Sequence, residues 1–349
     1  MRAPGRYSAT CEASPNIALV KYWGQRIPEY NVPYNSSLSL TLDGIATRTR
    51  VTFDPELPAD TLELNGRPAE EGPRADVSRF LDLFRERIRR PWHARVVSRN
   101  NFPTASGMAS SASGFAALAG AAMAALRLHW GLRNLSRYAR RGSGSAARSI
   151  YGGFVLWRAG RRWDGTDSYA VPFRGPDYWP EFRDIACLVD GAPVKSIRSQ
   201  EAMQRSVATS PVFARRQREL RKRIGRMKAA IDYRDAASLF PLIMEECDSF
   251  REVCETTDPP LDYLTPASRA ILDEVRAINR EAGRPVAAYT HDAGAHVHVF
   301  TTDRRAPALA RRLGGLTGVR ETRILRPGPG VRWLRSAGSE DPPVKLWGR

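Results

Sequence analysis

The run Ser14–Gly24 reads Ser-Pro-Asn-Ile-Ala-Leu-Val-Lys-Tyr-Trp-Gly and holds one lysine among apolar neighbours. Only five of the 54 lysine and arginine residues in the chain are lysines; Lys21 is the first of them, and the next is Lys195. Arginine stays protonated and presents a planar fork, whereas the lysine ammonium is a compact charge whose pKa responds to its surroundings. The sequence therefore predicts that Lys21 does chemistry that needs an ammonium group, with chance placement as the alternative.

A second segment, Pro103–Gly114, consists almost entirely of small residues and reads Pro-Thr-Ala-Ser-Gly-Met-Ala-Ser-Ser-Ala-Ser-Gly. Small side chains let the backbone approach a bulky anion, and the alanine-rich stretch that follows predicts a helix over about 111–130. The N-terminal amides and dipole of such a helix favour a phosphate group, and Ser110 and Ser111 add hydroxyls for phosphate oxygens or Mg²⁺. The segment is neither a GxxxxGK[ST] loop nor a GxGxxG fingerprint, so a flexible linker is the alternative.

A third segment, Arg140–Gly153, contains another small and hydroxyl-rich turn, Gly142–Ser145. Ser145 could cap a helix that follows this turn, and Arg148 would lie in the first turn of that helix. There its guanidinium could bind a carboxylate or a phosphate through two parallel hydrogen bonds. A structural cap beside a solvated arginine is the alternative.

A fourth segment, Tyr289–His298, carries a short acidic residue before Ala-Gly, between two strand-like runs. A loop in this position can present the Asp292 carboxylate in a cleft, where it could act as a general base. Aspartate before Ala-Gly is also a common turn former, which is the alternative. His296 and His298 would share one strand face, but without a matched third ligand we expect packed or surface histidines rather than a metal site.

Alternating and helical patterns indicate the elements that must position these segments. Period-two alternation predicts a strand over 7–20 and two strands within 36–54, around Asp43-Gly44. Ile185–Asp190 indicates a buried strand, and we expect the domain boundary near it. Helices should then dominate, covering roughly 200–231, 234–254 and 266–282.

Composition excludes several classes of protein. The 349 residues are 42% hydrophobic and 26% charged, as in ordinary globular proteins, and no apolar run reaches the length of a membrane span. The four cysteines lack CxxC spacing, which favours reduced thiols in a cytoplasmic protein over disulfides or a zinc site. Cys247 and Cys254 are seven residues apart and should pack in the core from one helical face.

The net charge of +17 raises the question of a nucleic-acid partner. No RNP-like, KH-like or zinc-finger pattern is present, and the densest cluster, Arg215–Arg226, alternates with apolar residues like the solvated face of an amphipathic helix. We therefore expect no specific nucleic-acid partner. An anionic small-molecule substrate accounts for part of the charge.

Taken together and in order, the four segments resemble the diphosphomevalonate decarboxylase family of the GHMP kinase superfamily, from about residue 8 to 330. The resemblance implies an α+β fold, the GHMP kinase fold. It has a ribosomal-protein-S5-like N-terminal domain over 1–184 and a ferredoxin-like C-terminal domain over 185–335, with the active site between them. A flexible tail over 336–349 completes the chain, and a homodimer is a further expectation.

The family's reaction is an ATP- and Mg²⁺-dependent decarboxylation in isoprenoid synthesis, so the resemblance implies these cofactors and a phosphorylated mevalonate substrate. Asp292 would deprotonate or orient the 3-hydroxyl, Lys21 would lie beside Asp292, and Arg148 would hold the carboxylate that leaves. Substrate contacts are implied for Ala18, Tyr22, Ser143, Ser145, Gln25, Arg26, Arg198 and Gln200. ATP contacts are implied for Pro103, Ser106, Gly107, Met108, Ala109, Ser110, Ser111 and Ala112, with Ser111 near Mg²⁺.

Two positions at the diphosphate end of the substrate depart from the family pattern. Gln25 stands where members that use a diphosphate usually have a lysine, and Gln200 aligns with an arginine near the same group, although Arg26 and Arg198 lie close by in sequence. Loss of two cations would weaken binding of the extra phosphate, since charge-assisted hydrogen bonds are the strong ones. Mevalonate 5-diphosphate is the expected substrate and mevalonate 5-phosphate the alternative. A 3-kinase that does not decarboxylate, and a basic nucleic-acid-binding protein, are the remaining alternatives.

Overall fold

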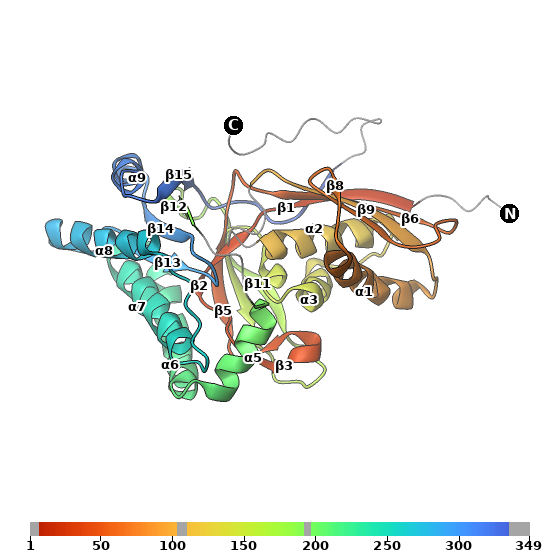
Figure 1. Cartoon of the computed structure of the whole chain (residues 1–349), viewed down its shortest axis with the longest axis horizontal. Helices are drawn as coiled ribbons and strands as arrows, with labels where there is room; N and C mark the ends of the chain where they lie inside the picture. Colours follow the sequence, from red (N-terminus) through yellow and green to blue (C-terminus); the bar gives the residue numbers. More distant parts are fainter. Residues whose placement is uncertain (1–6, 103–109, 192–196, 335–349) are drawn as a thin grey trace.

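The computed structural model describes residues 7–102, 110–191 and 197–334, and combines helices with largely antiparallel sheets (Figure 1). The predicted α+β class is confirmed. The first half of the chain and the second half form two groups of elements that lie side by side in Figure 1. The predicted domain limits at 184/185 and at 335 stay a prediction.

A six-stranded sheet is the scaffold of the first half. Its strands, in spatial order, are β16 (Arg332–Leu334), β1 (Tyr7–Ala13), β6 (Thr47–Asp54), β9 (His93–Asn100), β7 (Thr61–Leu64) and β8 (Arg67–Pro68). Strand β16 comes from the end of the described chain and pairs antiparallel with β1, with Trp333 opposite Cys11. A segment assigned by the sequence to the second domain thus lies in the sheet of the first half.

Helix α2 (Ser110–Ala125) packs against β1 and β6 of this sheet (Figure 1). It ends five residues before the predicted end, because Arg127 adopts a left-handed backbone (φ 52°) and the Leu128 N–H returns to the carbonyl of Met123 at 2.9 Å. Three further helices flank it: α1 (Glu71–Ile88), α3 (Leu132–Gly142) and α4 (Ala146–Ser149).

A second sheet carries the first chemical segment. Its order is β11 (Tyr169–Arg174), β10 (Phe154–Arg158), β5 (Ser37–Thr41) and β2 (Asn16–Val20). The single strand predicted over 7–20 is wrong: β1 and β2 lie in different sheets, and Ser14-Pro15 separates them. Pro15 has no N–H to donate to a ladder, so the chain leaves one sheet there and enters the next. A small ribbon follows, formed by β3 (Gln25–Ile27), the 3₁₀ turn η1 (Pro28–Tyr30) and β4 (Val32–Pro33).

A third, antiparallel sheet organises the second half. Its order is β13 (Ala288–His291), β14 (Val297–Thr302), β12 (Phe182–Val189) and β15 (Val319–Leu325). Helix α8 (Pro266–Glu281) packs against β13 and β14, and α9 (Ala306–Gly314) packs against β12 and β15. The link between β13 and β14 holds Asp292.

Three more helices complete the second half: α5 (Ser199–Thr209), α6 (Phe213–Asp232) and α7 (Ala236–Glu255). The single helix predicted over 200–231 is wrong, because Ser210 is extended (ψ 118°) ahead of Pro211. A residue that precedes proline is sterically disfavoured in the helical region, so α5 ends there and α6 begins anew. None of the helices in the described ranges is long and apolar enough to cross a bilayer.

Helix α6 also corrects the interpretation of the arginine cluster. Arg216 and Arg223 are buried and share a face with Leu220 and Met227, at helical spacings of three to four residues. The cluster does form an amphipathic helix, as its alternation predicts, but these two arginines lie on the apolar face of that helix rather than the solvated face. Cys247 and Cys254, by contrast, are buried free thiols on α7 as predicted.

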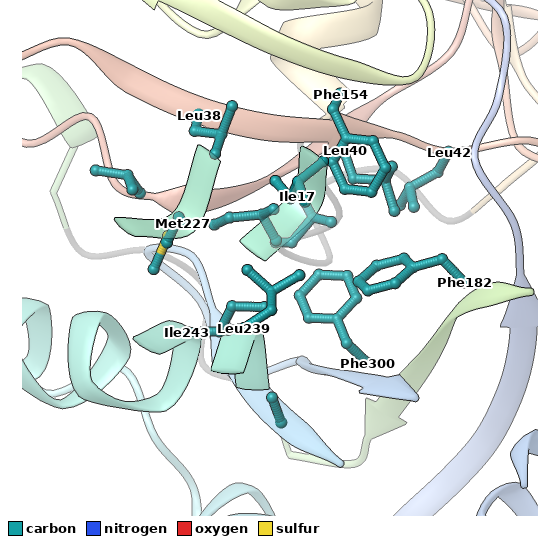
Figure 2. Packing of buried hydrophobic residues seen from close by; sticks show 14 of the residues in the cluster. Ile17, Leu38, Leu40, Leu42, Phe154, Phe182, Met227, Leu239, Ile243 and Phe300 are labelled. Atoms are coloured by element: carbon teal, nitrogen blue, oxygen red, sulfur yellow. The ribbon is translucent and has the colours of Figure 1, made fainter. Parts of the chain in front are cut away.

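One hydrophobic cluster joins the two halves (Figure 2). It brings β2, β5 and β10 against α6, α7 and the third sheet. Figure 2 labels ten of its members, Ile17, Leu38, Leu40, Leu42, Phe154, Phe182, Met227, Leu239, Ile243 and Phe300. Because Ile17 and Leu19 on β2 belong to this core, the residue that follows β2, Lys21, is held where the two halves meet.

Candidate active site

A cavity of about 1310 Å³ opens between the two halves. Its walls include parts of α1, the link 28–31, the start of α2, the turn 142–145, residues 189–191, the start of α5 and the link between β13 and β14. Lys21, Arg148 and Asp292, the three residues predicted to be catalytic, all line it. They come from three segments far apart in the chain.

Lys21 and Asp292 form an ion pair in this cavity. The Nζ of Lys21 donates to Oδ1 of Asp292 at 2.8 Å, and the side chains are 3% and 28% exposed, respectively. Burial by itself would raise the pKa of Asp292, but the charge and hydrogen bond of Lys21 outweigh it and lower that pKa below its ordinary value. Asp292 is therefore ionised at neutral pH, and the predicted contact with Lys21 is confirmed.

The loop that carries Asp292 is held by contacts to the Asp292 carbonyl. Its carbonyl accepts from the N–H of Gly294 at 2.7 Å and lies 2.8 Å from Nδ1 of His291. Burial, assisted by the charge of Lys21, lowers the pKa of His291 to about 4, so this imidazole is neutral at pH 7. Nδ1 of His296, another residue of the cavity wall, accepts from the N–H of Val189 at 3.2 Å.

Arg148 is buried at the cavity wall and aimed by two polar side chains. Its Nε donates to Oδ1 of Asn16 at 3.0 Å, and one terminal nitrogen donates to Oγ of Ser37 at 2.8 Å. The other terminal nitrogen makes no hydrogen bond within the described ranges, which leaves it for a ligand. Burial lowers the pKa of Arg148 to about 10, so it stays charged at pH 7. Sequence reasoning missed Asn16 and Ser37, because neither stands out from the strands that carry them.

Hydroxyl groups gather at the start of α2. Ser110 and Ser111 line the cavity, and Oγ of Ser143 donates to Oγ of Ser111 at 3.4 Å and lies 3.3 Å from Oγ of Ser145. Ser145 precedes α4 but its side chain makes no capping bond, so the predicted capping role is wrong and the hydroxyl contacts Ser143 instead. Two further predicted residues are placed by the structure: Ala18 lines the cavity, and Ala112 is buried in the first turn of α2.

The first part of the small-residue segment lies outside the described residues. This covers the predicted ATP contacts Pro103, Ser106, Gly107, Met108 and Ala109. The wall formed by Ser110 and Ser111 is continuous with it in sequence. The first amides of a helix lack acceptors within that helix, so the start of α2 is suited to an anion.

Gln25 and Gln200 are both hydrogen-bonded to Asn31, a residue that sequence reasoning missed. The Nε2 atoms of both glutamines donate to Oδ1 of Asn31, and from Gln200 the distance is 2.9 Å. The amide nitrogen of Asn31 donates to the carbonyls of Arg140 and Arg141, at 3.0 Å each. The two departures from the family pattern are thus one connected amide cluster, and Asn31 and Gln200 face the cavity.

The two arginines that precede or follow these glutamines in sequence, Arg26 and Arg198, differ in where their side chains lie. Arg26 donates to the carbonyls of Gly160 and Arg161, so its guanidinium binds a neighbouring loop and is not among the cavity-lining residues. Arg198 does line the cavity and lies 3.4 Å from Oδ2 of Asp76. Arg141, which no sequence pattern singled out, lines the cavity as well.

Two family models match the sequence of this chain. Residues 13–170 match the model of the diphosphomevalonate decarboxylase-like N-terminal domain, and residues 185–322 match the model of the mevalonate 5-diphosphate decarboxylase C-terminal domain. The chain belongs to the diphosphomevalonate decarboxylase family. The resemblance seen in the four segments is therefore confirmed.

Curated members of the family are similar over most of their length. The diphosphomevalonate decarboxylase of Aspergillus fumigatus is 40% identical over 328 residues, which cover 89% of this chain and 81% of that protein. That of Saccharomyces cerevisiae is 38% identical over 309 residues, which cover 84% and 78%.

Solved structures of diphosphomevalonate decarboxylases share the fold. One, described as MDDEF in complex with MVAPP, AMPPCP and magnesium, has a TM-score of 0.89 at 36% identity, covering 95% of this chain and all of that chain. The mevalonate diphosphate decarboxylase of Staphylococcus aureus also has a TM-score of 0.89, at 32% identity, covering 95% and 99%. The predicted two-domain GHMP-type fold is confirmed by these likenesses.

Proposed function

We propose that the protein catalyses the ATP-dependent decarboxylation of mevalonate 5-diphosphate to isopentenyl diphosphate. The observation that carries this proposal is the buried contact between Lys21 and Asp292 in a cavity that Arg148 also lines. The likeness to a decarboxylase solved with MVAPP, an ATP analogue and magnesium supports the same substrate class.

In the first step the 3-hydroxyl oxygen attacks the γ-phosphorus of ATP, the bond to ADP breaks, and the hydroxyl proton passes to Asp292. A general base must be ionised and within hydrogen-bond reach, and the lowered pKa of Asp292 meets the first condition. Lys21 stabilises the negative charge that develops around the transferred group. Phosphoryl transfer depends mainly on such positioning and charge stabilisation.

In the second step the new 3-phosphate leaves with the electrons of its C–O bond, the bond to the carboxylate breaks, and that electron pair forms the carbon–carbon double bond as CO₂ departs. Arg148 would hold the carboxylate until this point, since a guanidinium binds carboxylates with directional hydrogen bonds. Ser143 and Ser145 would contact neighbouring substrate oxygens.

The start of α2 fits the phosphates of ATP and a magnesium ion. Ser110 and Ser111 offer hydroxyl oxygens beside helix amides, and Mg²⁺ prefers oxygen ligands shared between protein and phosphate groups. Ser111 would contact the ion, and the residues 107–112 would bind the phosphates. When bound, Mg²⁺ neutralises charge on the transferred phosphoryl group.

Positive side chains at the cavity wall favour the diphosphate over the monophosphate. Arg198 and Arg141 line the cavity near the amide cluster of Gln25, Asn31 and Gln200, and would supply the charge that two glutamines cannot. The neutral amide cluster favours the second candidate, mevalonate 5-phosphate. Both substrates should therefore be offered in parallel with MgATP while ADP and CO₂ are measured. Release of ADP without CO₂ would instead indicate a 3-kinase.

The variant Arg198→Gln separates the two substrates. Removing a charge-assisted contact to the terminal phosphate should lower kcat/KM for the diphosphate about tenfold, a loss of about 1.4 kcal/mol, and leave the monophosphate within about twofold. Arg205→Gln on helix α5, which begins directly after Arg198, is the matched control, because Arg205 pairs with Glu201 and does not line the cavity. An equal loss with both substrates would argue against this role of Arg198.

The predicted contact of Tyr22 with the phosphate end of the substrate can be tested by substituting Gly144, which lies against the Tyr22 ring. A Cβ at Gly144 would come within 2.5 Å of the Tyr22 ring, which packs edge-on against Trp157. Gly144→Ala should therefore displace the ring into the cavity and raise KM for the phosphorylated substrate about tenfold, since overpacking typically costs about 1–3 kcal/mol. Gly131→Ala, which meets nothing within 4 Å, is the control for steady-state kinetics and melting temperature.

A further inference from the structure

The main chain of Lys21 is held by side chains rather than by a sheet. Lys21 lies between β2 and β3, where no strand partner is available to its N–H and C=O. Its N–H donates to Oε1 of Glu246 at 3.1 Å, and its carbonyl accepts from Nδ2 of Asn35 at 2.9 Å and from Arg216 at 3.4 Å. Both polar groups of this backbone unit are thus satisfied by three side chains distant in sequence.

Glu246 and Arg216 also bind each other. Arg216 donates to the same carboxylate oxygen of Glu246 that accepts from Lys21, and the side chains of Arg216 and Glu246 are 1% and 0% exposed. The other oxygen of Glu246 accepts from Arg223 at 2.7 Å, and Arg223 in turn binds Glu245 at 2.7 Å. Helices α6 and α7 therefore carry a charge network, formed by Arg216, Arg223, Glu245 and Glu246. At one end of this network Glu246 and Arg216 contact the main chain of Lys21.

The residues after Lys21 dock on the same two helices. Gln217 of α6 donates to the carbonyl of Trp23 at 3.5 Å, and the Trp23 ring packs edge-on against Phe250 of α7 at 5.0 Å. Gly24 lies so close to Phe213 that a Cβ would come within 2.6 Å of its ring. The link 21–24 is consequently fixed against α6 and α7 along its length.

We propose that Glu246 and Arg216 are positioning residues for the reaction: by holding the main chain of Lys21 on both sides of its α-carbon, they set its ammonium against Asp292. This inference rests on the proposed function. A buried ion pair gives little net stability compared with apolar residues of the same volume, so stability alone is a weak reason for burying these charges here. A displacement of about 1 Å in a catalytic group can cost about a hundredfold in rate, so the two members of the network that contact the Lys21 main chain, Glu246 and Arg216, have a function in holding it.

The kinetic test uses a double variant and a control within the same network. Arg216→Met with Glu246→Leu removes both charges of this pair together, and Arg223, which loses Glu246, keeps Glu245 as its partner at 2.7 Å. We expect kcat to fall about a hundredfold with KM for both substrates within about twofold. Glu246→Gln keeps an acceptor for the N–H of Lys21 and should recover part of this loss. Glu245→Gln is the matched control, because Glu245 contacts Arg223 but not Lys21, and should retain wild-type kcat.

A spectroscopic readout keeps this test separate from activity. The chain has only five lysines, so lysine labelled with ¹³C gives few Cε signals, and Lys21→Met identifies that of Lys21. We expect the Lys21 signal to move in the double variant and to stay unchanged in Glu245→Gln.

A folded double variant with the wild-type Lys21 signal and wild-type kcat would overturn the positioning role. An equal disturbance in Glu245→Gln would overturn it as well. If the double variant does not fold, the Lys21 signal of Arg216→Met decides in the same way, because this variant removes the contact with the Lys21 carbonyl and leaves Glu246 paired with Arg223. If the wild type fails to decarboxylate any phosphorylated mevalonate, the proposed function falls, while the Lys21 signal still tests the positioning.

Discussion

Asp292→Asn is expected to reduce kcat for decarboxylation by about 10³-fold. Asparagine has the size of aspartate and can still accept the hydrogen bond from Lys21, but it cannot take the proton of the 3-hydroxyl. Loss of a general base typically costs about 10²–10⁴-fold. The measurement is release of ADP and CO₂ under saturating MgATP and mevalonate 5-diphosphate.

Binding and folding should survive this substitution. The KM values and the melting temperature of Asp292→Asn should stay close to those of the wild type, since the amide oxygen of asparagine can still accept from the Lys21 ammonium. Asp273→Asn, on the exposed face of α8, is the control. Near-normal turnover of Asp292→Asn would show that another group accepts the proton, and would contradict the proposed mechanism.

Lys21→Met should lower kcat by about 10²–10³-fold, the range found when one group that stabilises transition-state charge is removed. Methionine matches the length of the lysine stem but carries no charge. Lys21→Arg restores the charge as a broad fork in a site where the lysine is 3% exposed, so it should recover little activity. Lys222→Met, on the exposed side of α6, should behave as the wild type.

The pH profile gives Lys21→Met a signature that a purely structural defect would not produce. In the wild type the pKa of Asp292 lies below its ordinary 3.8, so Asp292 remains ionised and kcat/KM shows no loss from its protonation above about pH 4. Without Lys21, burial becomes the dominant influence and raises the pKa of Asp292. The variant should therefore lose activity as pH falls through a range where the wild type is unaffected. Parallel profiles for both proteins would show that Lys21 does not hold Asp292 ionised.

The sequence predicted elements well where a pattern is local. The strands around Asp43-Gly44 and the helix over 266–282 needed only alternation or helical periodicity, and both are present as β5, β6 and α8. The failures have equally local causes that periodicity overlooks. Pro15 divides one predicted strand between two sheets, and Pro211 divides one predicted helix.

In the candidate site, too, the sequence identified some residues and not others. Residue types and motif order were enough to single out Lys21, Arg148 and Asp292, because a rare lysine, an arginine after a hydroxyl-rich turn and an aspartate before Ala-Gly are visible in the chain itself. The partners that orient them were not visible. Asn16, Asn31 and Ser37 are ordinary polar residues whose importance comes only from what they contact.

The sequence by itself therefore determined the family, the fold class and the groups that we propose carry the chemistry. Only the tertiary structure decided how those groups are arranged. Lys21 meets Asp292 across 271 positions and Glu246 across 225, and no periodic pattern encodes a contact of that separation. Burial also reversed one local interpretation: the helical pattern of Arg216 and Arg223 resembled a solvated face. Packing against α7 turned them inward, because Glu246 compensates their charge there.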